Sequence, residues 1–150
     1  LEVTPRVTPR CISLDNDGNS KEEVMKGMTD NLLLAGRCRY PRKLEADLWA
    51  REAVFSTGLG FSFAIPHSKS EHIEQSTISV ARLKAPVMWG DEEAQFIIML
   101  TLNKHAAGDQ HMRIFSRLAR RIMHEDFRNA LVNASSGEAI ASLLQHELEL

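Results

Sequence analysis

The spacing of apolar and polar positions along the chain predicts alternating helices and strands. After residue 20 and again after residue 41, apolar residues recur every three or four positions, the period of a helix with one buried face. Between the helical stretches, shorter segments show the alternation or the continuous apolar run of strands. This order predicts an α/β fold. We expect a three-layer sandwich in which helices flank both faces of a mixed sheet of about five strands.

Capping residues mark the expected helix ends. Ser20 and Glu23 form a capping-box pattern that opens the first helix, and Gly36 is expected to end it. Pro41 suits the first position of a second helix, whose apolar stripe is expected to continue through Phe55. The later helix signals are an N-cap at Asp109 and a capping-box pattern at Ser135 and Glu138.

The predicted strands are residues 11–14, 61–65, 77–83 and 96–102. In the second of these, Phe61, Phe63 and Ile65 alternate with small residues, and Pro66 is expected to end the strand. The last segment is apolar almost throughout, as in a strand that is buried on both faces. We therefore expect it at the centre of the sheet.

Length and composition favour a single domain, because 150 residues of which 43% are hydrophobic can build one sizeable core. Residues 1–10 contain two Thr-Pro-Arg triplets and are expected to form a linker or extended lead-in to a domain at 11–150 that can belong to a longer protein. The net charge of −2 argues against a nucleic-acid partner. No apolar run reaches the roughly 20 residues of a membrane span, so a cytoplasmic location is expected.

Four positions are candidates for chemistry. His67 directly follows a strand and Pro66, and its position alone favours a functional role and a simple turn equally. His111 lies near a helix start, where bound anions are stabilised, although a solvated first-turn residue is the simpler interpretation. Arg51 near a helix end can pair with a phosphoryl group or merely compensate the helix dipole.

The remaining candidate is the glycine pair Gly58 and Gly60. Glycines let backbone N–H groups approach an anion, but a connection of this kind is more often a plain turn. A metal site is not expected, because His67, His72 and His111 have no carboxylate or cysteine at a spacing that would complete it. No serine lies in a nucleophile elbow. What remains is chemistry in which a histidine is the nucleophile.

Four segments carry a resemblance when they are taken in order: Arg51-Glu52, Ser56-Thr57-Gly58-Leu59-Gly60, Ala64-Ile65-Pro66-His67 and Gln110-His111-Met112. Together they resemble the type 2 enzyme IIA domains of the fructose–mannitol family, which belong to the bacterial phosphoenolpyruvate-dependent sugar phosphotransferase system. The resemblance covers residues 11–148. The chain departs from the family pattern after Gly60, where Phe61-Ser62-Phe63 replaces small residues that are often asparagine and glycine.

The resemblance implies a phosphocarrier. His67 would accept a phosphoryl group from the phosphorylated carrier HPr and pass it to a cysteine of an enzyme IIB, during coupled sugar uptake and phosphorylation. His111 would stabilise the phosphoryl group. The resemblance implies no metal or cofactor, and it implies contact with the membrane only indirectly, through an enzyme IIC. Residues expected to bind the phosphoryl group or a partner are Arg51, Thr57, Gly58 and Gly60.

Two further expectations concern the use of the site. A carrier must release its phosphoryl group again, so His67 is expected to be exposed, within an apolar rim of Leu59, Phe61 and Met112. The alternative function is a regulatory domain of the same family, which would signal through its phosphorylation state.

Overall fold

The computed structural model describes residues 6–105 and 110–150, with the side chains of 110 and 111 left undescribed. Five helices and six strands are formed by the described residues. In chain order they are β1 (Arg6–Asn16), α1 (Lys21–Leu34), α2 (Pro41–Glu52), β2 (Gly58–Gly60), β3 (Phe63–Ala64), β4 (His67–Ser70), β5 (Thr77–Trp89), β6 (Glu92–Asn103), α3 (Gln110–Ile122), α4 (Glu125–Asn133) and α5 (Gly137–Leu148).

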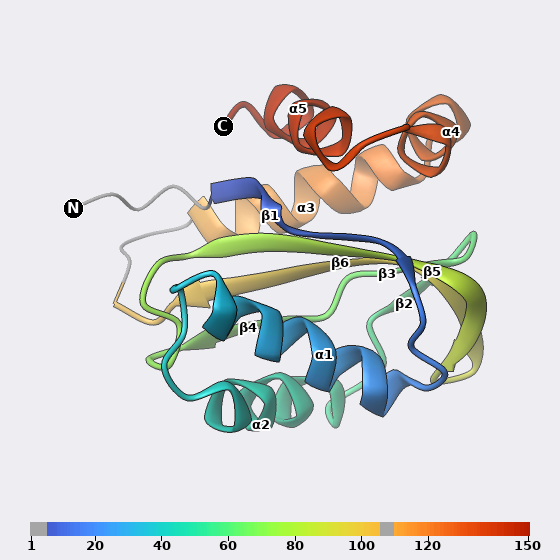
Figure 1. Cartoon of the computed structure of the whole chain (residues 1–150). Coiled ribbons are helices and arrows are strands. Elements are labelled where there is room, and N and C mark those ends of the chain that lie inside the picture. The colour runs from blue at the N-terminus through green and yellow to red at the C-terminus, as the bar shows by residue number, and fades with distance from the viewer. Residues whose placement is uncertain (1–5, 106–109) are drawn as a thin grey trace.

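The strands form one mixed sheet in the order β1-β5-β6-β3-β2, and β4 also pairs with β6. β1 is parallel to β5, β5 is antiparallel to β6, and both β3 and β4 are parallel to β6. Helices α1 and α2 cover one face, whereas α3, α4 and α5 cover the other (Figure 1). The predicted three-layer α/β sandwich is confirmed. None of the helices in the described part of the chain combines the length and the apolar character needed to cross a membrane.

β6 is the inner strand that the sequence predicts. It lies between β5 on one edge and β3 with β4 on the other. Ile98 and Leu100 pack with the helices α3 to α5, whereas Ile97 and Met99 pack with α1 and α2, and all four are 0% exposed. The apolar run is continuous because both faces of the strand are covered. The sheet thus separates the apolar interior into two clusters.

The strand leading to His67 differs from the prediction. Phe61 and Ser62 have φ angles of 57° and 67°, a left-handed conformation that cannot belong to an extended strand, so β3 begins only at Phe63. β3 ends at Ala64, so the strand does stop before Pro66, but pairing with β6 resumes beyond it. The Pro66 carbonyl accepts a hydrogen bond from the N–H of Leu100 at 2.9 Å, and His67 pairs with Leu100 in the same register. Because proline lacks only the donor, pairing with β6 resumes, and His67 begins β4.

The helix ends are partly as predicted. Ser20 caps α1 by accepting the N–H of Glu23 at 3.1 Å, and Pro41 is the first residue of α2. However, α2 ends at Glu52, so Phe55 lies beyond the apolar stripe and is 71% exposed. The cap of α5 is Ser136 rather than Ser135, since its hydroxyl accepts the N–H of Ala139. The predicted cap Asp109 lies outside the described residues.

The expected lead-in is shorter than residues 1–10, because β1 begins at Arg6. Val7 is 4% exposed, pairs with Ile78 of β5 and accepts a hydrogen bond on its carbonyl from the Gln145 side chain at 3.0 Å. The register is irregular between Val7 and Ile12. Residues 6–10 therefore belong to the sheet, with an irregular stretch that accommodates Pro9.

The central strand allows a test of the fold. Replacing Ile98, which is 0% exposed, with alanine should lower the free energy of unfolding by about 2–5 kcal/mol, through lost burial and the cavity left behind. Met88→Ala on β5 is the control, because Met88 is 57% exposed and should change stability by no more than about 0.5 kcal/mol. Urea unfolding measures both, and equal effects would contradict the placement of β6.

Candidate functional site

His67 is held by a hydrogen bond that selects its tautomer. Its Nδ1 lies 2.9 Å from the carbonyl oxygen of Ile65. A carbonyl can only accept, so the proton is on Nδ1 and the lone pair is on Nε2. The backbone two residues before the imidazole therefore leaves Nε2 as the nucleophilic nitrogen.

Arg51 lies against that nitrogen. It belongs to the last turn of α2, and its Nε donates to Nε2 of His67 at 3.2 Å. A terminal nitrogen of the same guanidinium donates to the carbonyl of Phe55 at 3.0 Å. The structure thus brings together two of the predicted site residues, with a cation at the reactive side of the imidazole.

His67 is half-buried, whereas the sequence analysis expects an exposed side chain. The ring of Phe115 from α3 covers it, with ring centroids 4.4 Å apart. Burial lowers the pKa of His67, the Arg51 charge lowers that pKa further, and the Ile65 carbonyl and Glu52 oppose the change. The imidazole is therefore neutral near pH 7, as a nucleophile must be.

A buried polar network lies behind Arg51 and was not predicted. Lys21 and Glu52 form an ion pair at 2.9 Å, with side chains 14% and 2% exposed. Burial would raise the pKa of Glu52, but hydrogen bonds from Thr57 and Lys21 outweigh it and lower that pKa. Lys21 also lies 5.1 Å from the ring centroid of Trp89. Nothing in the spacing of these residues indicates that they meet, since Lys21 and Glu52 are 31 positions apart.

Thr57 belongs to this network. Its N–H donates to Oε2 of Glu52 at 3.1 Å, and its hydroxyl donates to Oε1 of the same carboxylate. The hydroxyl in turn accepts the indole N–H of Trp89 at 3.0 Å. Thr57 is 5% exposed, so both of its donors are used inside the protein and its contribution to the site is indirect.

Gly58 and Gly60 form β2, which pairs with β3 beside the site. A Cβ atom at Gly58 would lie 3.0 Å from the carbonyl oxygen of Trp89, and Gly60 has a φ of +84°. Both positions therefore favour glycine for reasons of packing and turn geometry. Their expected contact with a phosphoryl group stays a prediction.

His111 lies in the first turn of α3, and its side chain is outside the described part of the structure. Phe115, which contacts His67, follows it by four residues on the same helix. The role of His111 stays a prediction.

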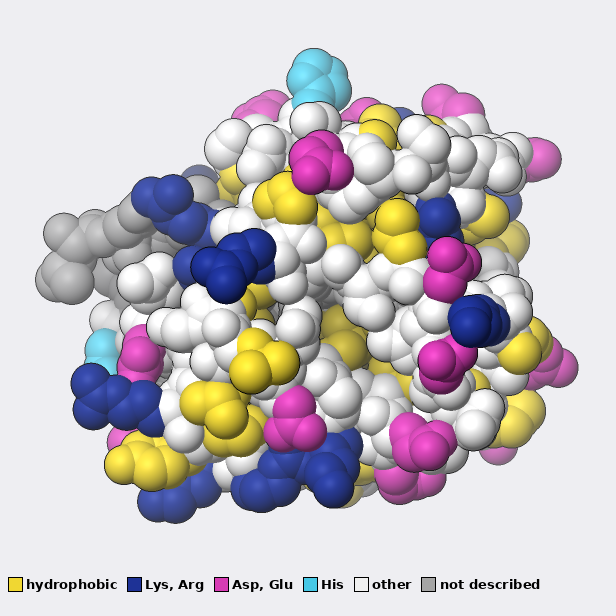
Figure 2. Space-filling view, viewed as in Figure 1, with side chains coloured by type: hydrophobic (Ala, Val, Ile, Leu, Met, Phe, Trp, Pro, Cys, Tyr) yellow, Lys and Arg dark blue, Asp and Glu magenta, His cyan; other side chains and the backbone are white. Residues whose placement is uncertain are grey.

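Phe61 and Met112 are 54% and 61% exposed, and their expected place in an apolar rim around His67 stays a prediction. Leu59 is only partly exposed and packs against the core. Phe55, 71% exposed beside Arg51, is an apolar side chain that was not predicted for this surface. On the face with α1 in front, acidic and basic side chains are interspersed (Figure 2).

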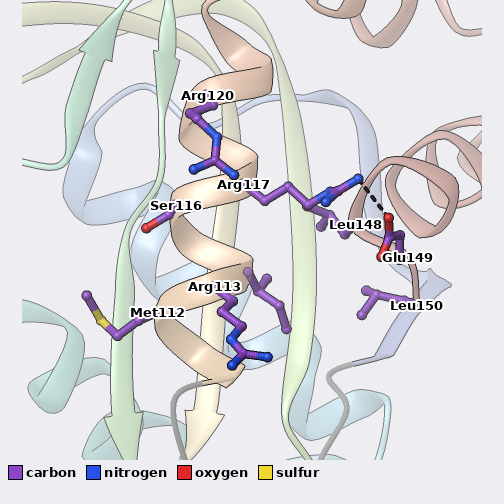
Figure 3. A pocket seen from close by; sticks show the side chains of 9 residues that line it. Met112, Arg113, Ser116, Arg117, Arg120, Leu148, Glu149 and Leu150 are labelled. Carbon is purple, nitrogen blue, oxygen red and sulfur yellow. Dashed lines mark hydrogen bonds and ion pairs between the residues drawn. The ribbon is translucent and has the colours of Figure 1, made fainter.

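A separate groove of about 540 Å³ lies between α3 and α5 (Figure 3). Arg113, Arg117 and Arg120 line one side, and Arg117 pairs with Glu149 at 3.0 Å. Met112 of the expected apolar rim also lines this groove, whereas Arg51, Thr57 and His67 do not.

Residues 7–147 match the family described as phosphoenolpyruvate-dependent sugar phosphotransferase system, EIIA 2. The chain belongs to this family. The EIIA 2 match covers β1 from its second residue and all the later strands, and it contains His67, Arg51 and His111. The domain is therefore a phosphotransferase domain, and the resemblance drawn from its motifs is confirmed.

Similar proteins support the same assignment. The chain is 89% identical over 146 residues to multiphosphoryl transfer protein 2 of Escherichia coli (strain K12), matching 97% of the chain but spanning only 18% of that protein. It is 30% identical to a PTS system fructose-specific EIIA component of Haloferax volcanii, with 95% of both chains covered. The crystal structure of nitrogen regulatory protein IIA-Ntr from Neisseria meningitidis superposes with a TM-score of 0.81 at 27% identity, covering 91% of this chain and 94% of that one.

The site geometry predicts the titration of His67. Its pKa should lie below the ordinary value of about 6.5, and Arg51→Ala should raise it by removing a positive charge and part of the cover. Arg39→Ala, which removes an exposed ion pair with Glu74, should leave it unchanged. NMR titration of the ring measures all three proteins. An unchanged pKa in Arg51→Ala would contradict the contact with Nε2.

Proposed function

We propose that this EIIA 2 domain carries a phosphoryl group on Nε2 of His67. It accepts the group from the phosphohistidine of HPr or an HPr-like domain and passes it to a cysteine of an enzyme IIB during coupled sugar uptake and phosphorylation. The observation that carries this proposal is the 2.9 Å contact between Nδ1 and the Ile65 carbonyl, because it puts the proton on Nδ1 and the nucleophilic lone pair on Nε2.

In the first step Nε2 attacks phosphorus, so a new N–P bond forms as the N–P bond of the donor histidine breaks. The proton stays on Nδ1, where the Ile65 carbonyl stabilises the positive charge that develops on the ring. In the second step a cysteine thiolate of the partner attacks phosphorus, so an S–P bond forms as the Nε2–P bond breaks, and the electron pair returns to Nε2 to give the neutral imidazole. Transfer of this kind depends on positioning and charge stabilisation, which Arg51 at 3.2 Å is placed to supply.

The helix start at α3 is the second source of charge stabilisation. Its N-terminus carries partial positive charge, and the phenyl ring of Phe115 one turn later lies on the imidazole of His67. We propose that His111, four residues before Phe115 in the sequence, contributes to this stabilisation. The amides at Gly58 and Gly60 are the third proposed source.

The relatives favour a transport chain over a purely regulatory role. One is a multiphosphoryl transfer protein at 89% identity, and another is named a fructose-specific EIIA component. We propose that the domain works in the cytoplasm and reaches the membrane only through an enzyme IIC that accepts the sugar.

The identity of the phosphorylated residue is testable directly. Incubation with phosphoenolpyruvate, enzyme I and HPr should give an acid-labile, alkali-stable phosphoprotein with the label on His67, and His67→Ala should accept none. His72→Ala is the control, because the His72 imidazole contacts Glu71 at 3.7 Å, and this variant should be labelled fully. Stoichiometric labelling of His67→Ala would rule out the assignment.

His111→Ala should leave His67 able to accept the group but slow its transfer. Removal of one donor from a preorganised oxyanion site costs about 100- to 1,000-fold in rate, and a half-buried carrier site should lose less. Quench-flow measurement of both half-reactions tests this, with His72→Ala again as the control. Wild-type rates in both directions would leave His67 with Arg51 and backbone donors only.

A further inference from the structure

Glu52 is a buried carboxylate that the transfer step does not use. It accepts the Lys21 ammonium at 2.9 Å, the Thr57 N–H at 3.1 Å and the Thr57 hydroxyl. These groups come from α1 and from the segment after α2, so the carboxylate joins two elements at one point. The imidazole of His67 is hydrogen-bonded to Arg51 and Ile65, and not to this carboxylate.

Stability alone does not explain why the Lys21–Glu52 ion pair is buried. Removing two charges from water costs several kcal/mol per ion in general, and apolar residues of similar volume often stabilise a fold as well. The two tryptophan rings near Lys21 offset only part of such a cost. The buried charge of Glu52 is therefore expected to have a role besides stability.

Two routes lead from the carboxylate to the two ring nitrogens of His67. On one side, Arg51 is the residue directly before Glu52 and donates to Nε2 at 3.2 Å. On the other side, the Thr57 carbonyl accepts the N–H of Ile65 at 3.0 Å, and the Ile65 carbonyl binds Nδ1 at 2.9 Å. Thr57, which is hydrogen-bonded to Glu52, is thus also hydrogen-bonded to Ile65, the residue that orients the imidazole.

We propose that Glu52, with Lys21 as its buried counter-ion, is a positioning residue for phosphoryl transfer. It sets Arg51 against Nε2 and, through Thr57 and Ile65, holds the Nδ1 side of the imidazole. This inference rests on the proposed function of His67.

The test is Glu52→Gln, which keeps the shape of the side chain and removes its charge. Transfer from phosphorylated HPr should slow by about 10- to 100-fold, as expected when reacting groups are displaced by about 1 Å. The pKa of His67 should fall further, because the negative charge that opposes its lowering is lost. NMR titration measures this second quantity without any partner protein.

Glu45→Gln is the matched control. Glu45 lies on the same helix and binds Arg42 at 2.8 Å and the Trp49 indole at 2.9 Å, whereas the hydrogen bonds of His67 go to Arg51 and Ile65. Its transfer rate and His67 pKa should equal those of the wild type. A folded Glu52→Gln protein that matches Glu45→Gln in both quantities overturns the proposal.

A double-mutant cycle separates positioning from general weakening. If Glu52 acts partly through Arg51, adding Glu52→Gln to Arg51→Ala should slow transfer less than adding it to the wild type. Equal losses in the two backgrounds would overturn the Arg51 route. If Glu52→Gln does not fold, Thr57→Val replaces it; this change removes the hydroxyl that donates to Glu52 and accepts the Trp89 indole N–H. It should slow transfer from phosphorylated HPr, and a wild-type rate overturns the proposal.

Failure of the proposed function would look different. In that case the wild-type protein itself would not be labelled on His67 by phosphorylated HPr. The tautomer and pKa of His67 in Glu52→Gln would still test whether the carboxylate positions the ring.

Discussion

The pairing of β6 on both edges is the constraint on which the two layers and the site depend. Its side chains alternate between the two apolar clusters, so the strand joins the layer of α1 and α2 to that of α3, α4 and α5. β3 and β4 follow β6 in one register, with His67 opposite Leu100. Because central strands usually open only with global unfolding, the imidazole is attached to one of the most stable parts of the sheet.

Opposing requirements meet at His67. A carrier nitrogen must be neutral and nucleophilic, yet the group that it receives is an anion that needs positive charge nearby. Half-burial under Phe115 and the charge of Arg51 both favour the uncharged imidazole. In the proposed function, Arg51 also supplies the positive charge near the anion. The same lowering of the His67 pKa makes the folded protein lose stability as pH falls through about 6.5, since the unfolded chain then binds the proton more readily.

The turn between β2 and β3 combines strain with exposure. Phe61 and Ser62 have left-handed backbone conformations, which cost a non-glycine residue roughly 1–2 kcal/mol each. The Ser62 carbonyl accepts two backbone N–H groups of β6, at 2.8 and 3.0 Å, and the Arg128 guanidinium lies 4.0 Å from the Phe61 ring centroid. These contacts offset the strain and hold an aromatic side chain at the surface where the family commonly has small residues.

Local patterns in the sequence determined the central strand and the cap at Ser20, because each depends on residues that are adjacent or at a fixed period. The tertiary structure decided the rest. The new strand that begins at His67 depends on pairing with β6, and the half-burial of His67 depends on how α3 packs against the sheet. The contact between Lys21 and Glu52 depends on two helices meeting, and no local period encodes which distant side chains become neighbours.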